Sequence, residues 1–330
     1  MTTAIRRRRV VVAALSVVLG LVLAGCGSGP SQVNAAAIVN GKVISVGQVQ
    51  HLVDRAVELE PGAKVLADQR KLGDLSREVL GQLITHELIS AYMAQNPVRI
   101  DPAQVSQLAE QIRSSLQPLP EGGASPEAIV ANAATKVLEP EFLARDYLAL
   151  AQIGGSEISS LKVTIDYAVL SPQNGGTGSL RDKALAKARE LAAGYDEAKQ
   201  VQQRDTASGE LQWDTGTFEP LQINQELQGS ALFGTPPGNV VAFQASAENA
   251  AWVIALVRDR QVGPPTADAG QTPLAATISM GQRVLQQWVD KAGVNVSPRY
   301  GVYDKIAMRL APSEATSAGV LLPVKGAPQQ

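Results

Sequence analysis

The sequence predicts an α+β protein in which a mainly helical domain, built from both ends of the chain, carries a small inserted α/β domain. Three observations lead to this prediction. Apolar residues recur with helical spacing up to about residue 152, and a β-branched run at 163–170 follows a break at 154–156. One further amphipathic helix then returns at 274–292. An inserted domain is the simplest arrangement that accommodates this order.

The composition is that of a folded globular chain. Of 330 residues, 45% are hydrophobic and 18% are charged, which excludes bulk disorder and a coiled-coil fibre. The formal net charge is −2, but residues 1–25 hold four arginines and no acid. Without that segment 25 basic residues face 31 acidic ones, a net charge of −6. A chain of this sign without a basic run is a poor nucleic-acid binder.

The N-terminus has the features of an export signal. Arg6–Arg9 precedes an apolar run of 15 residues, Val10–Ala24, which is too short to span a bilayer core of ~30 Å. The run ends in Leu23-Ala24-Gly25-Cys26, which resembles the lipobox of bacterial lipoproteins. That resemblance implies cleavage of a signal peptide over residues 1–25 and a lipid on Cys26. We therefore predict a tether over 26–35 and anchoring to the outer face of the bacterial cytoplasmic membrane; a plain secretory signal is the alternative.

Local signals divide the next segment into a hairpin and a series of helices. Asn40-Gly41 is a turn signal between short apolar stretches, and Ser45 can cap the helix that follows. Apolar spacing and stop signals predict helices at about 46–60, 68–94, 102–116, 125–135 and 139–152. These elements make residues 36–155 one helical domain. Core positions are predicted for Leu52, Leu83, Leu108 and Leu143, with exposure to a bound client as the alternative for each.

The character of the sequence changes after residue 155. A strand at 163–170, a glycine-rich turn, a helix at 180–193 and a strand pair at 240–243 and 252–257 predict a small α/β domain over 160–261. A linker at 263–273 precedes a returning helix and strand over 274–305, which we expect to pack on the helical domain. The tail over 312–330 is predicted to be mobile.

Several segments together resemble the SurA/PrsA-type extracytoplasmic foldases. The opening Ile38–Ile44 is similar to the first hairpin of that group, and Leu80–Ile89 to the second helix of its chaperone domain. Residues 163–260 look like a divergent parvulin module, and Val294–Gly301 resembles the returning strand. The resemblance implies a helical chaperone domain with an inserted parvulin-like domain. It also implies an ATP-independent extracytoplasmic chaperone or foldase whose partners are unfolded exported polypeptides.

The parvulin-like module departs from its family at the residues that matter for catalysis. Parvulins usually carry a histidine on the first and on the last strand, and those positions here are Tyr167 and Trp252; no histidine follows His86. Asp205 lies near the acidic or thiol position of the family. We therefore predict a catalytically degenerate isomerase pocket without catalytic residues, lined by Tyr167, Asp205, Trp213, Phe218, Phe233 and Trp252. A weak or altered peptidyl-prolyl isomerase, with these aromatic residues as its proline pocket, is the alternative.

Other chemistry has little support in the sequence. His86-Glu87 begins like a metalloprotease motif, but Ser90 stands where the second histidine ligand is needed, and a structural or surface role is predicted for His86. Gly175–Gly178 lacks the Lys-Ser/Thr end of a phosphate-binding loop. One cysteine and two histidines leave little for a disulfide or a metal. We predict no metal, cofactor or nucleotide, and no nucleic-acid partner; an envelope scaffold or adaptor is the remaining alternative.

Overall fold

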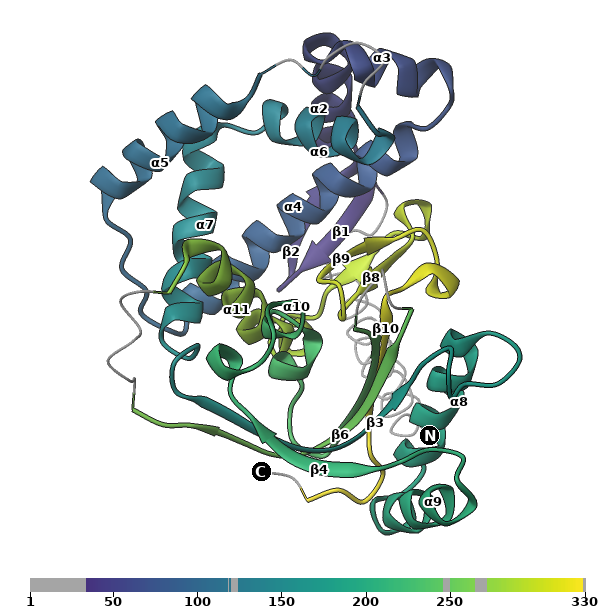
Figure 1. Cartoon of the computed structure of the whole chain (residues 1–330). Helices are drawn as coiled ribbons and strands as arrows, with labels where there is room; N and C mark the ends of the chain where they lie inside the picture. Colours follow the sequence, from purple (N-terminus) through teal and green to yellow (C-terminus); the bar gives the residue numbers. More distant parts are fainter. Residues whose placement is uncertain (1–33, 118, 120–123, 246–249, 265–271, 329–330) are drawn as a thin grey trace, which may run out of the picture.

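The computed structural model describes residues 34–117, 119, 124–245, 250–264 and 272–328 (Figure 1). Helices make up one half of the molecule and the largest sheet lies in the other, which confirms the α+β class. The predicted signal peptide, Cys26 and most of the tether lie outside the described residues. Within the described part of the chain, no helix combines the length and the apolar character needed to cross a bilayer.

A short hairpin joins the two ends of the helical domain. Strands β1 (Ala35–Val39) and β2 (Lys42–Ser45) pair around Asn40 and Gly41, whose φ angles of 50° and 77° are those of a tight hairpin turn. Strand β7 (Asn295–Val296) pairs with the other edge of β1. Residues almost 260 positions apart in the chain thus share one sheet, so the helical domain is closed by both ends of the chain.

Seven helices of the helical domain follow from local signals. They are α2 (Val46–Leu59), α3 (Pro61–Asp68), α4 (Leu72–Met93), α5 (Pro102–Ser115), α6 (Pro126–Val137), α7 (Pro140–Gly155) and α11 (Leu274–Gln286). The Ser45 hydroxyl accepts a hydrogen bond from the Gln48 N–H at 3.0 Å and so caps α2, as predicted. Asp101 and Ser125 cap α5 and α6 in the same way, and each of these two helices begins with a proline.

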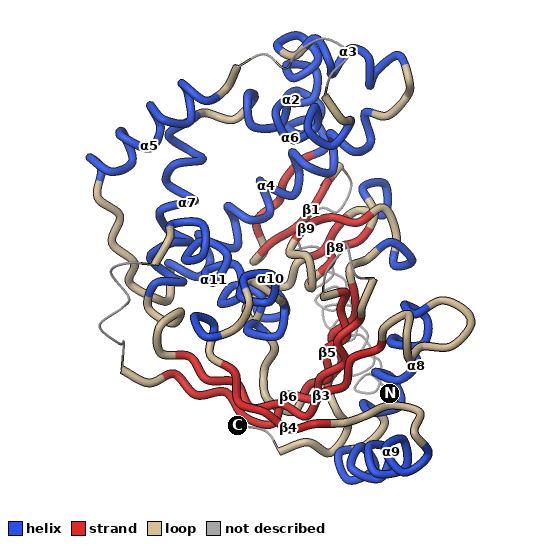
Figure 2. The backbone as a smooth tube through the Cα atoms, viewed as in Figure 1, coloured by secondary structure: helices blue, strands red, loops and turns tan. Residues whose placement is uncertain are grey.

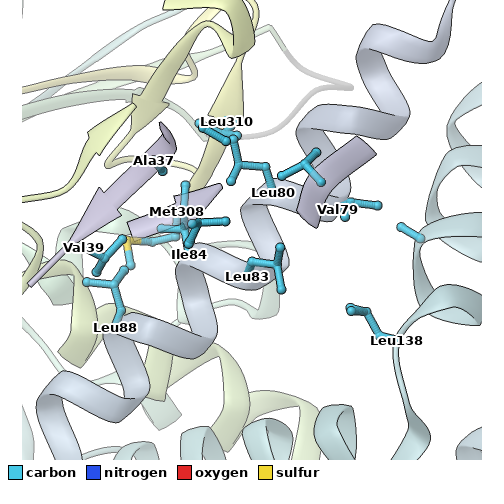
Figure 3. Close-up of a cluster of buried hydrophobic side chains, with 14 of the residues drawn as sticks. Ala37, Val39, Val79, Leu80, Leu83, Ile84, Leu88, Leu138, Met308 and Leu310 are labelled. Atoms are coloured by element: carbon cyan, nitrogen blue, oxygen red, sulfur yellow. The ribbon is translucent and has the colours of Figure 1, made fainter. Parts of the chain in front are cut away.

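Helix α4 carries the centre of the helical core (Figure 3). Its fully buried side chains recur at helical spacing, and they are Leu75, Val79, Leu80, Ile84 and Leu88. Figure 3 shows Ala37 and Val39 of β1 and Met308 and Leu310 from near the C-terminus beside this helix. Each buried leucine or isoleucine contributes about 1.5–3 kcal/mol to stability, so α4 holds both chain ends on one core.

Helices α7 and α11 cross unusually closely. A Cβ added to Gly154 would lie 2.0 Å from the Thr277 carbonyl oxygen, and one added to Gly281 would lie 2.1 Å from that of Leu150. Only glycine allows the two backbones this approach. The returning helix is thereby fixed against the last helix before the insert.

The inserted domain is built on an antiparallel five-stranded sheet with the order β10-β5-β6-β3-β4 (Figure 2). Its elements within the insert are β3 (Leu161–Leu170), α8 (Leu180–Ala192), α9 (Tyr195–Ser208), β4 (Asp214–Phe218), α10 (Gln225–Gln228), the 3₁₀ turns η1 (Pro220–Gln222) and η2 (Ala231–Gly234), β5 (Asn239–Gln244) and β6 (Trp252–Val262). Strands β3 and β6 form the long central pair, from Leu161↔Val262 to Leu170↔Trp252.

Each face of this sheet is covered by a different part of the chain. Helix α8, with α9 packed against it, covers the face that we call the α8 face. The turn η2 and helix α11 cover the opposite face, which we call the α11 face; Met280 of α11 is fully buried in its core. One sheet face is therefore covered by helices of the insert, and the other is an interface with the helical domain.

The C-terminal segment is ordered, and the prediction of a mobile tail over 312–330 is wrong for the described residues of that range. After α12 (Val289–Ala292) and the hairpin of β8 (Val302–Asp304) and β9 (Arg309–Ala311), strand β10 (Gly319–Pro323) pairs with β5. Val320, Leu322 and Val324 pack into the α8-face core with the alternation of a strand. The apolar run of β10 is only a few residues long and is flanked by glycine and proline, so the sequence alone gives a weak strand signal. The run becomes a strand because it pairs with the otherwise unpaired edge of β5.

Candidate functional site

The residues predicted to line an isomerase pocket lie on opposite faces of the sheet. The α11 face holds Tyr167, Phe218 and Phe233 in or against its core. The α8 face holds Trp213 and Trp252, and Asp205 lies on α9 on the same side. Side chains alternate along a strand. Because Tyr167 pairs with Ala255, Trp252 three positions earlier on β6 points to the other side. The structure therefore does not bring these residues together in one pocket.

Asp205 is fully buried in a network of charged and polar groups. Its carboxylate lies 3.0 Å from the Lys187 ammonium and 2.6 Å from the Arg204 guanidinium. It also accepts a hydrogen bond from the Trp213 indole N–H at 3.2 Å. These partners occupy the carboxylate, and they tie α8, α9 and the segment before β4 together. The geometry gives Asp205 a structural role.

The α11 face is filled rather than open. Tyr167 and Phe218 meet edge to face with centroids 5.5 Å apart, and Phe233 is fully buried. Beyond Phe233 lies α11, so close that a Cβ on Gly234 would lie 2.6 Å from the Arg283 carbonyl oxygen. A polypeptide substrate could reach this face only if α11 moved away.

A buried arginine marks the same interface. The Arg283 guanidinium donates hydrogen bonds of 2.8 Å to the Gln286 side chain and to the Ile306 carbonyl oxygen. The Gln286 amide donates to the Ala231 carbonyl oxygen of η2 at 3.3 Å. Burial lowers the pKa of Arg283 to about 10. Polar bonds as well as apolar packing thus join α11 to the insert and to the C-terminal segment.

A cleft with a volume of about 710 Å³ lies in the helical domain. One face of α4 lines it, through Asp74, Arg77, Glu78, Gly81, Gln82 and Thr85. Helices α6 and α7 contribute further lining, and so does the segment around the β8–β9 hairpin. At Gly81 an added Cβ would meet no atom within 4 Å, so the space above α4 is open there.

The lining of this cleft combines apolar and ionisable groups. Its apolar lining consists of the partly exposed Phe142 and the buried Leu143, Met308 and Leu310. Beside them the Asp146 carboxylate lies 2.9 Å from the Nδ1 atom of His86, whose ring stacks on Phe142 with centroids 4.3 Å apart. Burial raises the pKa of Asp146, and the hydrogen bond from His86 opposes that shift. Such a mixed surface suits a polypeptide with both polar and apolar groups.

The sequence analysis did not predict this cleft, although it singled out some of the residues in or beside it. His86, predicted to be structural or on the surface, is partly buried and hydrogen-bonded to Asp146, which lines the cleft. Of the leucines predicted to be core, Leu83 and Leu143 are buried and Leu52 and Leu108 are partly buried. Polar residues at i, i+3, i+4, i+7, i+8 and i+11 of α4 were the available signal. That stripe alone is indistinguishable from an ordinary solvated helix face.

The described residues offer no group of three or more histidine, cysteine, aspartate or glutamate side chains arranged to hold a metal ion. The cleft likewise places no hydroxyl nucleophile beside a base: His86 is bonded to Asp146 through Nδ1.

Comparisons with known proteins agree with the sequence-based resemblance. Residues 1–125 match the family of the SurA-like N-terminal domain. None of the curated proteins matches the chain. Among solved structures, one is from a study of PEB4 and Cj1289, two SurA-like chaperones of Campylobacter jejuni; it is 11% identical, covers 80% of this chain and 98% of its own, and has a TM-score of 0.20.

A second solved structure is the foldase protein PrsA of Streptococcus pneumoniae. It is 13% identical to this chain, covers 79% of it and 94% of its own length, and has a TM-score of 0.20. The match to the family of the SurA-like N-terminal domain covers the hairpin β1–β2 and helices α2 to α5. Residues 1–125 of this chain thus match the SurA-like N-terminal domain, in agreement with the resemblance that its sequence shows to the SurA/PrsA-type foldases.

Proposed function

We propose that this protein is an ATP-independent extracytoplasmic chaperone that binds unfolded exported polypeptides in the cleft beside α4. The observation that carries the proposal is the cleft of about 710 Å³ in a SurA-like helical domain, lined by both apolar and polar side chains. Binding of unfolded chains needs accessible apolar surface and adaptable polar contacts, but no reactive group. Dissociation alone then releases the bound chain.

We further propose that the inserted domain is catalytically degenerate. Peptidyl-prolyl isomerisation crosses a barrier of ~18–20 kcal/mol and needs polar groups placed around the twisting amide in an accessible pocket. Here the predicted pocket residues are divided between two sheet faces, and Phe233 lies beneath α11. Both observations support a domain that holds the fold together without catalysing isomerisation.

The setting that we propose is the outer face of the cytoplasmic membrane, with the chain anchored through Cys26. The lipobox-like Leu23-Ala24-Gly25-Cys26 supports this setting. Two or three acyl chains, each gaining ~0.8 kcal/mol per buried CH₂, give a firm anchor. Mass spectrometry of the N-terminal peptide from membrane fractions tests the anchor: the peptide should begin at a lipid-modified Cys26, and an unmodified thiol there would contradict it.

The chaperone role is tested by blocking the cleft at Gly81. A Gly81→Trp substitution fills open space above α4, so it should weaken suppression of client aggregation several-fold while leaving the fold intact. Light scattering of an unfolded exported protein, diluted from denaturant without nucleotide, measures the effect. Gly81→Ala is the small control at the same position, and Gln104→Trp on the exposed surface of α5 adds the same bulk elsewhere. Full activity of Gly81→Trp would remove the cleft from the mechanism.

Proline-limited refolding of a client separates the remaining alternatives. We expect the purified chain to give no acceleration above the uncatalysed rate. Acceleration near that of an active parvulin, lost in Trp252→Ala, would instead establish the weak-isomerase alternative. A chain that neither suppresses aggregation nor accelerates refolding would be a scaffold or adaptor.

A further inference from the structure

Acidic residues outnumber basic residues in the lining of the cleft. Seven ionisable residues other than tyrosine line it, five of them acidic: Asp74, Glu78, Glu127, Asp146 and Asp304, against Arg77 and Arg309. The imbalance exceeds that of the whole chain, in which 31 acidic residues face 29 basic ones. The cleft is therefore a negatively charged concavity, and low-dielectric walls strengthen the potential inside such a shape.

Three of the five carboxylates are already compensated within the protein. Asp74 forms an ion pair with Arg77, and Asp146 forms hydrogen bonds with the Nδ1 atom of His86. Asp304 is buried and accepts hydrogen bonds from backbone N–H groups, among them that of Ile306 at 2.9 Å. These groups shape the cleft, but they contribute little net attraction for a ligand.

Glu78 on α4 and Glu127 on α6 form no ion pair within 4 Å with a described residue, although the charge of Lys71 reaches Glu127; they face Arg309 as the remaining cation of the lining. Hydrogen bonds from its own backbone N–H and from Ser125 lower the pKa of Glu127, which keeps it ionised at neutral pH. Burial, then the charges of Glu78 and Asp146, raise the pKa of Tyr147 in the cleft wall. The field of these carboxylates thus reaches across the lining from α4 to α7.

The Glu78 carboxylate is held by a neighbouring side chain on α4. Gln82 donates its amide N–H to that carboxylate at 3.2 Å. A carboxylate accepts further hydrogen bonds, so a ligand that pairs with Glu78 must supply donors. Lysine and arginine side chains supply donors and positive charge together.

From this lining we propose that the cleft selects unfolded segments in which lysine or arginine lies close to apolar residues. The basic side chain would pair with Glu78 or Glu127, and its apolar neighbours would pack on the partly exposed Val130, Phe142 and Tyr147. This inference rests on the proposed function, because it names the class of client that the chaperone cleft takes. Charge complementarity of this kind sets partner choice and association rate.

Three matched peptides test the inference. Each is a labelled, unstructured twelve-residue peptide with the same leucine and phenylalanine content, and its three variable positions hold lysine, glutamine or glutamate. Binding to the mature chain is measured by fluorescence anisotropy. We expect the lysine peptide to bind about tenfold more tightly than the glutamine peptide and the glutamate peptide to bind most weakly. High salt should remove the difference, because screening weakens exposed charge pairs.

Substitutions of the two glutamates test whether they cause the preference for the lysine peptide. A Glu78→Gln/Glu127→Gln double variant should lose the preference for lysine and keep its affinity for the glutamine peptide. Glu58→Gln/Asp196→Asn removes the same charge from exposed positions outside the cleft and should bind like the unaltered chain. Equal binding of lysine and glutamine peptides, both lost in Gly81→Trp, would overturn the inference and leave the chaperone cleft standing. Failure of all three peptides to bind would overturn both.

Discussion

At the scale of single residues, Asp205 illustrates how position in the fold changes the role of a side chain. The sequence places it near the acidic or thiol position of parvulins, yet its carboxylate is fully buried among Lys187, Arg204 and Trp213. Lys187 is itself buried and also contacts two partly exposed glutamates. A buried cation of this kind depends on its carboxylate partners.

We predict that Asp205→Ala lowers the free energy of unfolding by about 2–3 kcal/mol, because it leaves the Lys187 ammonium buried with fewer partners. Urea denaturation followed by tryptophan fluorescence measures the change. Glu190→Ala is the matched control: it removes a partly exposed carboxylate 3.0 Å from the same ammonium and should cost about 1 kcal/mol or less. Equal costs for the two variants would mean that burial of Asp205 is not what matters.

At the scale of elements, the contact between α7 and α11 depends on two glycines. A Cβ added to Gly154 or to Gly281 would lie about 2 Å from a backbone carbonyl oxygen of the other helix. Glycine inside a helix normally costs about 1 kcal/mol relative to alanine. Here that cost is offset by close packing that no other residue permits.

Gly281→Ala should therefore destabilise the protein by about 1–3 kcal/mol through overpacking, although alanine favours helices. Gly155→Ala, at the end of α7 where an added Cβ meets nothing within 4 Å, should be neutral or slightly stabilising. Thermal unfolding monitored by far-ultraviolet circular dichroism compares the two. If both alanine variants raise the melting temperature, the helices are not held as closely as described.

At the scale of the whole molecule, the C-terminal segment connects the two domains. It leaves the helical core at the β8–β9 hairpin, adds β10 to the sheet of the insert, and buries Val324 in the α8-face core. The Tyr195 N–H also donates to the Lys325 carbonyl oxygen at 3.0 Å, so the segment reaches the start of α9. Together with α11 it joins insert and helical domain on both sides.

A chain that ends at Ser317 lacks β10 and should lose the single cooperative unfolding transition expected of the full chain. The insert, with the edge of β5 unpaired, should unfold at a lower urea concentration than the helical domain. In a Trp288→Phe background the fluorescence comes from Trp213 and Trp252, both in the insert, while circular dichroism follows mainly the helices. Coincident transitions in the truncated chain would contradict this, and a chain ending at Pro328 is the control.

Much of the fold could be predicted because its signals are local. The Asn40-Gly41 turn, the Ser45 cap and the helical spacing of apolar residues on α4 are each encoded within a few neighbouring positions. The site was harder, since neither the sheet face of Trp252 nor the covering of Phe233 by α11 can be obtained from neighbouring residues. The prediction of one isomerase pocket was therefore wrong, because its residues lie on opposite faces of the sheet.

The sequence by itself determined the α+β class, the first hairpin, most helices of the helical domain and the family of the N-terminal domain, because turn chemistry, capping and apolar periodicity act over a few residues. Tertiary structure alone decided that the tail forms β10 and that α11 covers one face of the sheet. It also decided that polar residues of α4 line a cleft with acids from distant helices. These outcomes depend on which surfaces segments far apart in the chain present to one another, and no local pattern specifies that.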